Sequence, residues 1–208
     1  MRLEFVCSAA LLLAGSGMAS ADVVLFTDNF DAYAHALNWT GGGNWTVSNG
    51  TVDLIGRSSG GVQYFDLLPG NGNYVDLDGS TNNPGRMTTN SVFNFLAGHT
   101  YTLSFKLGGS QRGNGTNTAD VAVGIGSLFS ETFSLGANAG FTTYTRTFTA
   151  GVSTAANTSF SFEGTGNGDN MGLLLDNVQL IHVIPLPTSA AMGLAGLVGI
   201  GAVRRRFR

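Results

Sequence analysis

Residues 101–107 read Tyr101-Thr102-Leu103-Ser104-Phe105-Lys106-Leu107, and every second side chain is large and apolar. Successive side chains of a β-strand point to opposite faces of a sheet, so this alternation places the apolar residues on one face and the polar ones on the other. The same pattern returns over a shorter span at Phe160-Ser161-Phe162. The stretch therefore predicts a strand with one buried face, which is typical of antiparallel sheets.

The rest of the chain has the composition of an all-β protein. It contains 31 glycines, and Ser, Thr and Asn separate short apolar runs throughout, whereas charged residues make up only 11% of the sequence. Such a composition favours tight turns and strands over helices. We expect strands at 23–27, 44–47, 51–55, 62–67, 74–77, 87–95, 100–107, 120–125, 128–135, 141–148, 158–163 and 173–182. This pattern predicts two packed antiparallel sheets in a jelly-roll-like β-sandwich.

The charge balance disfavours nucleic-acid binding, and the cysteine content excludes disulfides and thiolate metal sites from residues 22–183. Residues 22–183 carry five basic and twelve acidic side chains, and this balance disfavours a nucleic-acid-binding protein because such proteins depend on basic patches. The single cysteine, Cys7, lies before residue 22. Residues 22–183 therefore contain neither a disulfide nor a thiolate metal site.

Residues 1–21 have the three parts of a secretory signal peptide. Arg2 gives a positive start, residues 6–14 form a short apolar run, and Ala19-Ser20-Ala21 fits the small-x-small rule for cleavage. We expect cleavage after Ala21, with Ala19 and Ala21 as the recognised small residues. The mature domain is then residues 22–183.

Residues 184–208 have the pattern of a membrane tail. A proline-containing motif at 184–188 precedes an uncharged run at 189–203 and an arginine cluster at 204–208. As a helix, residues 190–203 would reach about 21 Å, and the apolar core of a bilayer is about 30 Å thick. Length alone leaves a buried core helix open as the alternative. The arginines favour a single transmembrane helix, because basic residues beside a span stay on the cytoplasmic side.

This tail resembles the PEP-CTERM sorting signal in its V-P-L-P-A variety. The matching residues are Pro185, Leu186, Pro187, Arg204, Arg205 and Arg206. The resemblance implies export by signal peptidase, anchoring in the membrane by the C-terminal helix, and processing by an exosortase-type protease. It also implies a final location at the cell surface or outside the cell, among proteins of an exopolysaccharide or biofilm matrix.

The body resembles jelly-roll modules of the galactose-binding-like type. The similarity is carried by the stretches 73–79 (Asn-Tyr-Val-Asp-Leu-Asp-Gly), 98–105 and 175–180. It implies that the first and last strands lie side by side. It further implies a structural Ca²⁺ held by Asp28 or Asp31 together with Asp176.

Aromatic residues are the candidates for contact with a carbohydrate. Sugars present apolar C–H faces that suit aromatic side chains. We expect ligand-binding roles for Trp39, Tyr64 and Tyr74, with packing in the core as the alternative for each.

Catalytic signals are weak. Asp76 and Asp78 are spaced to lie on one face of a strand, which suits a Ca²⁺ pair, the acid–base couple of a glycosidase, or a solvated turn. Glu131 and Glu163 stand at positions expected to face solvent. The histidines have no zinc-site spacing, and no nucleophile motif occurs. We therefore predict no enzymatic activity.

The sequence predicts an exported surface or matrix protein that binds carbohydrate, with polysaccharide as a partner and no nucleic acid. Two alternatives remain open. One is a purely structural surface protein without a ligand, and the other is a glycan-cleaving hydrolase that uses Asp76 or Glu163.

Overall fold

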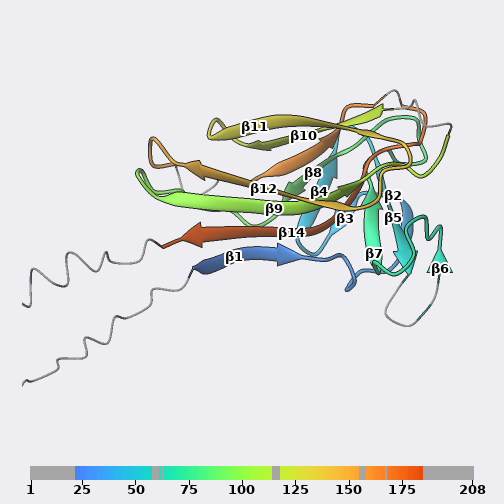
Figure 1. Cartoon of the computed structure of the whole chain (residues 1–208), viewed down its shortest axis with the longest axis horizontal. Helices are drawn as coiled ribbons and strands as arrows, with labels where there is room; N and C mark the ends of the chain where they lie inside the picture. The colour runs from blue at the N-terminus through green and yellow to red at the C-terminus, as the bar shows by residue number, and fades with distance from the viewer. Residues whose placement is uncertain are drawn as a thin grey trace, which may run out of the picture. The chain divides into compact units, whose positions relative to one another are not determined.

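The computed structural model describes residues 22–57, 61, 63–113, 118–154, 158–166 and 168–184. These residues form an all-β domain of two antiparallel sheets, which confirms the predicted β-sandwich (Figure 1). No helix in this part of the chain has the length and apolar character needed to span a bilayer. The predicted signal peptide, with Ala19 and Ala21, and the predicted tail, with Pro185 to Pro187 and the arginines at 204–206, lie outside the described residues.

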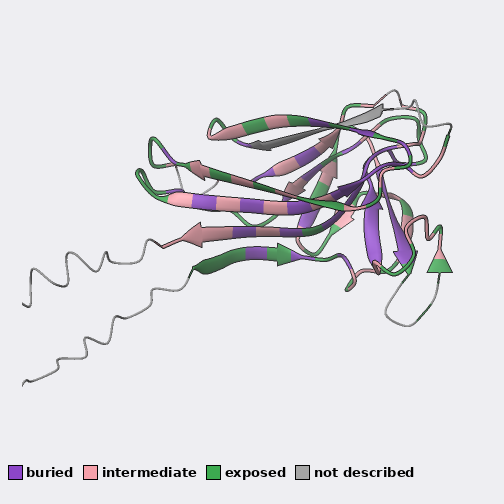
Figure 2. Ribbon diagram, viewed as in Figure 1, coloured by how far each residue is buried: buried purple, intermediate pink, exposed green. Residues whose placement is uncertain are grey.

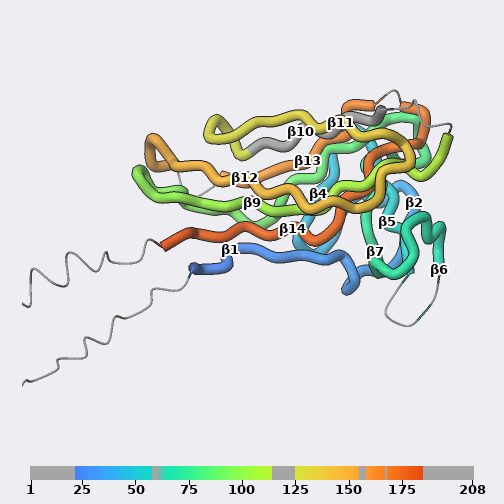
Figure 3. Tube along the Cα trace, viewed as in Figure 1, coloured from blue at the N-terminus to red at the C-terminus, as the bar shows by residue number. Residues whose placement is uncertain are grey.

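The larger sheet has eight strands in the order β12-β9-β14-β7-β5-β2, with β1 beside β14 and β6 beside β5. Its strands are β1 (Val23–Asp28), β2 (Ala36–Trp39), β5 (Val52–Arg57), β6 (Gln63–Tyr64), β7 (Asn73–Asp76), β9 (Thr100–Gly108), β12 (Thr142–Thr149) and β14 (Leu174–Val183). The first strand, β1, pairs with the last, β14, as the jelly-roll resemblance implies (Figure 3).

The second sheet has six strands in the order β11-β10-β13-β8-β4-β3. Its strands are β3 (Gly41–Gly42), β4 (Trp45–Ser48), β8 (Arg86–Thr89), β10 (Thr118–Ile125), β11 (Phe129–Gly136) and β13 (Ser161–Gly164). Chain segments pass between the two sheets several times, so sequence neighbours such as β4 and β5 belong to different sheets.

The main core lies between the sheets and follows from the alternation in residues 101–107. On β9, Tyr101, Leu103, Phe105 and Leu107 are buried, and the polar residues between them are half-buried on the other face (Figure 2). The opposite sheet contributes Trp45, Met87, Ile125, Phe133 and Phe162. Each large apolar side chain buried in this way stabilises the fold by about 1.5–3 kcal/mol.

Two predicted strands are much shorter than expected. The stretch 62–67 forms only β6, because Phe65 has a left-handed backbone with φ of 48° that ends the pairing. The stretch 87–95 forms only β8, after which Phe93 and Phe95 enter the core from a loop. The short strands β2 and β3 were not predicted, since neither contains an alternating run.

A second, smaller apolar cluster covers the outer face of the larger sheet. It consists of Ile55, Tyr74 and Leu174, with half-buried Tyr64, Leu67, Leu68 and Phe141 packed against it. Strands β5 and β7 are consequently buried on both faces, and Figure 2 shows β7 and most of β5 as buried. The segment after β6 covers this part of the sheet, and the candidate site lies beneath it.

Candidate functional site

A small cavity lies on the outer face of the larger sheet, beside the second apolar cluster. On β5, Val52 and Leu54 belong to the main core, so Asp53 and Ile55 point to the opposite face. The cavity has a volume of about 100 Å³, and its apolar lining consists of Leu37, Ile55, Phe65 and Leu67. Its polar lining consists of Asp53, Asp76, Ser80 and Arg112. The cavity thus combines an apolar wall with two carboxylates and one guanidinium group.

The cavity is closed toward the sheet and open toward solvent. Asp53 and Asp76 are only 4% and 1% exposed, whereas Phe65 and Leu37 are 59% and 40% exposed. A ligand group that enters the cavity must therefore pass Phe65 and Leu37 before it reaches the carboxylates.

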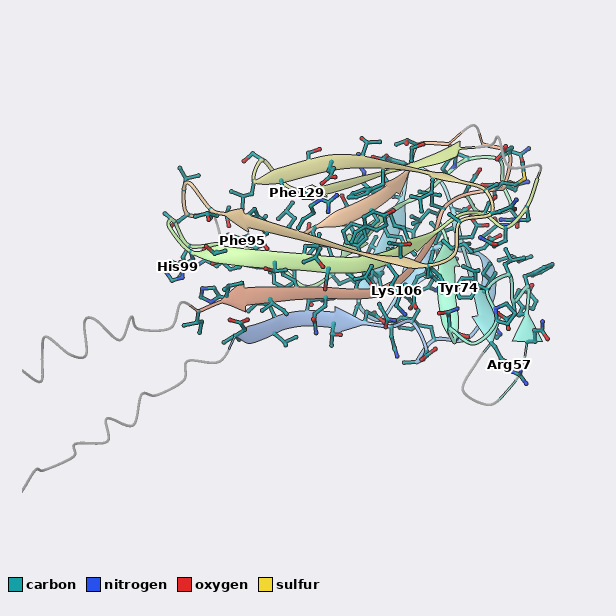
Figure 4. The ribbon with its side chains drawn as sticks, viewed as in Figure 1. Arg57, Tyr74, Phe95, His99, Lys106 and Phe129 are labelled. Atoms are coloured by element: carbon teal, nitrogen blue, oxygen red, sulfur yellow. The ribbon has the colours of Figure 1, made fainter. Side chains whose placement is uncertain are left out.

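Tyr74 fixes the segment that covers the cavity. Its hydroxyl accepts hydrogen bonds from the backbone N–H groups of Leu67 at 2.5 Å and Leu68 at 2.8 Å, and donates one to Asp66 Oδ1 at 3.3 Å. Burial raises the pKa of Tyr74 to about 12. Tyr74 lies on β7 (Figure 4) and its side chain is completely buried, which matches the alternative of packing in the core, and its hydroxyl positions the covering segment.

Asp76 is the most deeply buried charged group of the cavity. Its Oδ1 accepts the backbone N–H groups of Asp78 and Gly172, both at 3.0 Å, and its Oδ2 pairs with the guanidinium of Arg112. Gly172 permits this approach, since a Cβ there would lie 2.5 Å from Asp76 Oδ1. Burial raises the pKa of Asp76 to about 7, although Arg112 acts to lower it.

Asp53 is the register partner of Asp76 across β5 and β7. Its Oδ1 accepts the N–H groups of Asn38 at 2.7 Å and Ser80 at 3.2 Å, and its Oδ2 accepts the hydroxyl of Ser80 at 2.6 Å. These three donors fix the position of the Asp53 carboxylate. The negative charge of Asp53 in turn raises the pKa of Asp76.

Arg112 reaches the cavity from the loop after β9. Gln111 shapes this loop: its backbone has φ of 56°, and its side-chain amide donates to the carbonyl groups of Gly109 at 3.0 Å and Ala139 at 2.7 Å. One terminal nitrogen of Arg112 pairs with Asp76, and the buried Nε has no hydrogen-bond partner among the described residues. Arg112 therefore offers a free donor directly beside a carboxylate.

Phe65 stands at the mouth of the cavity at the end of an aromatic row. Its ring contacts Tyr64 edge-on at 4.9 Å, and Tyr64 stacks on His35 at 5.5 Å. His35 Nε2 is in turn hydrogen-bonded to Asn73 Oδ1 at 2.9 Å. A left-handed backbone at a bulky residue costs on the order of 1–3 kcal/mol, and such strain concentrates at binding sites. Tyr64, a predicted ligand-binding residue, does not line the cavity itself and packs against Phe65, which does.

Trp39 does not reach this cavity. It is half-buried, lies 5.4 Å from the ring of Tyr33, and packs against the main core. Its indole also lies over Gly42, whose Cβ position is 3.8 Å from Trp39 Nε1. The structure therefore separates Trp39 from Tyr64.

Asp28 forms a saturated hydrogen-bond centre. Its Oδ1 accepts the N–H of Phe30 at 2.9 Å, and its Oδ2 accepts Tyr33 Oη–H at 2.6 Å, Asn44 Nδ2–H at 3.0 Å and Trp45 Nε1–H at 2.9 Å. Four N–H and O–H donors already contact the two oxygens of Asp28, which argues against the predicted calcium role of this residue.

The other two predicted calcium ligands are also engaged. Asp31 accepts the N–H of Asn73 at 2.8 Å, and Asp176 accepts the N–H of Asn177 at 2.7 Å and lies 3.7 Å from Lys106 Nζ. Burial raises the pKa of Asp176 to about 6, and the charge of Asp31 adds to this rise. The described part of the chain contains no group of three His, Cys, Asp or Glu side chains arranged to hold a metal ion. Calcium binding by Asp31 and Asp176 stays a prediction, and the partners that both carboxylates already hold argue against it.

The predicted pair Asp76 and Asp78 does not form a solvated turn, because both side chains are 1% exposed. Burial raises the pKa of Asp78, against the lowering effect of the backbone N–H groups of Met171 and Asn170. Glu163 forms an ion pair with Arg86 on the neighbouring strand β8, and Glu131 on β11 forms one with Arg146 on β12 of the other sheet, both away from the cavity.

Three residues of the site were missed by sequence reasoning: Asp53, Phe65 and Arg112. Asp53 lies on strand β5, Phe65 in the loop after β6 and Arg112 in the loop after β9, and no local motif joins them. One usable signal exists for Arg112, since basic residues are rare between 22 and 183.

Solved structures share this fold. The chain is similar to a cyclase from Fischerella sp. TAU, with 15% identity, a TM-score of 0.54, and coverage of 81% of this chain and 100% of that one. It is also similar to the arabinose-bound α-L-arabinofuranosidase MgGH51, with 13% identity and a TM-score of 0.50, where the match covers 81% of this chain and 27% of the other. A third likeness is to the CBM22-1 xylan-binding domain of Paenibacillus barcinonensis Xyn10C, with 13% identity, a TM-score of 0.46, and coverage of 80% and 99%.

No model of a known protein family and no curated protein matches the sequence. The two structures with TM-scores of 0.54 and 0.50 show a shared fold. The function of this chain is therefore argued from its own residues.

Proposed function

We propose that residues 22–183 form a carbohydrate-binding domain that uses the cavity between Phe65 and Arg112. The observation that carries this proposal is the placement of Phe65. An aromatic side chain that is 59% exposed and has a φ of 48° stands directly beside buried polar groups. Sugars combine apolar C–H faces with hydroxyl groups, so they match an aromatic surface next to hydrogen-bonding groups.

The polar groups suit hydroxyls in particular. A hydroxyl group both donates and accepts, and the cavity lining pairs a donor, the guanidinium of Arg112, with an acceptor, the carboxylate of Asp76. Because these groups are buried, a hydrogen bond made there is stronger than one made in water.

Binding of the full-length chain to a panel of glycans tests the proposal, with Phe65→Ala as the key variant. We expect Phe65→Ala to weaken binding at least tenfold, which corresponds to about 1.4 kcal/mol. Val152→Ala is the matched control, since Val152 is 66% exposed and does not line the cavity. If no glycan binds, or if both variants bind as the wild type does, the domain is a structural module without this site.

A second candidate function is glycan cleavage, and Asp76 favours it. A carboxyl group with a pKa of about 7 beside a hydrogen-bonded carboxylate has the pattern of an acid–base pair. Release of reducing ends that disappears in Asp76→Ala but persists in Glu163→Ala would establish this activity, and its absence leaves binding alone.

We further propose that the protein is exported and sorted. The support is the pattern of residues 1–21, the motif at Pro185, Leu186 and Pro187, and the arginines at 204–206. Signal peptidase would cleave after Ala21, and the span at 189–203 would anchor the chain until an exosortase-type protease acts near the motif. The domain would then lie at the cell surface or in an extracellular polysaccharide matrix.

Mass spectrometry of the mature protein from its native cell tests this sorting scheme. We expect a new N-terminus at Asp22 and a new C-terminus close to Pro187. A chain that still ends at Arg208 would contradict processing and leave only an anchor.

A further inference from the structure

We propose that the cavity selects neutral glycans over glycans that carry carboxylate or amine groups. This inference rests on the proposed carbohydrate binding and specifies which class of sugar the same site accepts. It follows from the size of the cavity, from the signs of the charges in it, and from the hydrogen-bonding capacity that those charges leave free.

The size of the cavity limits what enters it. The cavity has a volume of about 100 Å³. Whole ligands occupy pockets of roughly 300–1,000 Å³. The cavity therefore takes a hydroxyl or hydroxymethyl group of one sugar unit, while the ring stays outside against Phe65 and Leu37.

The carboxylates oppose an acidic group. Asp53 and Asp76 both line the cavity, and Arg112 is the one cationic group in its lining. The guanidinium is already paired with Asp76. A uronate carboxylate in this space would therefore face the full charge of Asp53 without a free counter-charge, and such like-charge contacts are unfavourable.

The guanidinium opposes an amine group. An ammonium group only donates hydrogen bonds, and the guanidinium of Arg112 in the lining is itself a donor. Both oxygens of Asp53 already accept hydrogen bonds from Ser80, and one accepts a second from Asn38. An ammonium would have to displace these donors and would lie against a like charge.

A neutral hydroxyl meets neither obstacle. It can accept from the guanidinium of Arg112 and donate to a carboxylate oxygen of Asp76, so it meets both groups without a change in net charge. Buried polar groups that are left without partners make a site discriminate strongly.

The experiment compares matched oligosaccharides with the full-length chain. The probes are gluco-, galacto- and manno-oligosaccharides, the corresponding oligouronates, and chitosan-type oligoamines of equal length, measured by calorimetry at pH 7.5. We expect at least one neutral series to bind and its charged counterparts to bind at least tenfold more weakly. Phe65→Ala should remove the binding of the neutral series.

Asp76→Asn makes the test sharper. The variant removes one negative charge and keeps the shape of the side chain, and burial, which raises the pKa of Asp76 to about 7, favours a neutral group there. We expect it to reduce the discrimination between the neutral series and the oligouronates at least threefold. Asp169→Asn, an exposed carboxylate outside the cavity, is the control and should leave the ratio unchanged.

The outcomes separate this inference from the proposed function. Oligouronates or oligoamines that bind as tightly as the neutral series, with binding lost in Phe65→Ala, would overturn the inference and leave carbohydrate binding in place. A lack of any binding that depends on Phe65 would overturn both.

Discussion

Trp45 donates its indole N–H to Asp28 Oδ2 at 2.9 Å, and this hydrogen bond joins the two sheets. Asp28 ends β1 in the larger sheet, and Trp45 begins β4 in the smaller one. Both side chains are buried, at 8% and 1% exposure. A carboxylate at this place therefore acts as a fixed link inside the sandwich.

Substitution of Asp28 by Asn should destabilise the domain. One acceptor oxygen becomes an NH₂ group, so at least one donor among Tyr33, Asn44, Trp45 and the Phe30 N–H is left without a partner. A buried donor without a partner costs about 1–3 kcal/mol. We expect a loss of that size in the free energy of unfolding, measured by urea denaturation.

Trp45→Phe tests whether the loss of stability in Asp28→Asn comes from the hydrogen bond to Trp45. The substitution removes the indole N–H and keeps an aromatic ring in the core. The losses of unfolding free energy in the two single variants should therefore not add up in the double variant. A double-mutant cycle should show a coupling of about 0.5–3 kcal/mol. Additive effects would contradict the link between these two side chains.

Chelation should leave the melting temperature unchanged. The oxygens of Asp28 hold four donors, and Asp176 is paired with Lys106 and with the Asn177 N–H. A bound ion would stabilise the fold in proportion to its affinity. Thermal melts in EDTA and in millimolar CaCl₂ test this point. A melting temperature that falls in EDTA and recovers with calcium would instead establish an ion, and its loss in Asp31→Asn would locate it.

The fold could be predicted because a strand that is buried on one face has alternating apolar and polar residues. Residues 101–107 alternate because one face of β9 packs in the main core and the other does not. The pairing of β1 with β14 was likewise implied by the resemblance at the last strand. Where a strand is buried on both faces, its sequence does not show this alternation.

For this reason the residues of the candidate site could not be predicted from the sequence pattern. Tyr74 and Val75 are both buried, on opposite faces of β7, so the sequence of this strand does not show which side chain faces outward.

Contacts between distant segments of the chain cannot be predicted from local sequence patterns either. His99 and His182 are 83 residues apart, yet their ring nitrogens lie 2.8 Å from each other, at the end of the sandwich opposite Tyr74 (Figure 4). Arg112 and Asp76 meet in the same way, through pairing of strands that no local pattern specifies.

The stability of the domain should increase as the pH falls from 8 to about 5. Burial raises the pKa of Asp76 to about 7 and that of Asp176 to about 6, whereas an unfolded Asp has a value near ~3.9. Between these values the native state binds protons that the unfolded state does not, so unfolding becomes harder as protons are added. Urea midpoints at several pH values measure the effect.

The variant Asp76→Asn identifies the main group behind this slope, because Asn mimics the protonated carboxyl. We expect the variant to show a flatter dependence between pH 5 and pH 8 than the wild type does. Below that range the effect should reverse, since Arg146 lowers the pKa of Glu131 and its ion pair is lost on protonation. A wild-type midpoint that increases steadily up to pH 8 would contradict the burial of these carboxyl groups.

Arg146 should protect the domain from self-association. It lies on β12, the edge strand of the larger sheet, and its Nε and Nη2 donate to Glu131 on β11, the edge strand of the smaller sheet, at 2.5 and 2.6 Å. The guanidinium also lies 5.1 Å from the centre of the Phe133 ring, which places it between the sheets. A charge that points inward from an edge strand disfavours pairing with another chain. Replacement of Arg146 by Val removes this charge and leaves an eight-residue, Thr-rich edge.

We expect Arg146→Val to change the melting temperature little, because ion pairs this exposed contribute about 0–1 kcal/mol. Light scattering at high protein concentration should nevertheless show a clear increase in aggregates. Thr145→Val is the matched control: it adds an apolar side chain to the same strand, at an exposed position, and keeps the arginine. Equal aggregation of the two variants would assign the effect to apolar surface instead of the edge charge. Arg146→Lys should remain soluble, since a positive charge at this position is what blocks the pairing of edges.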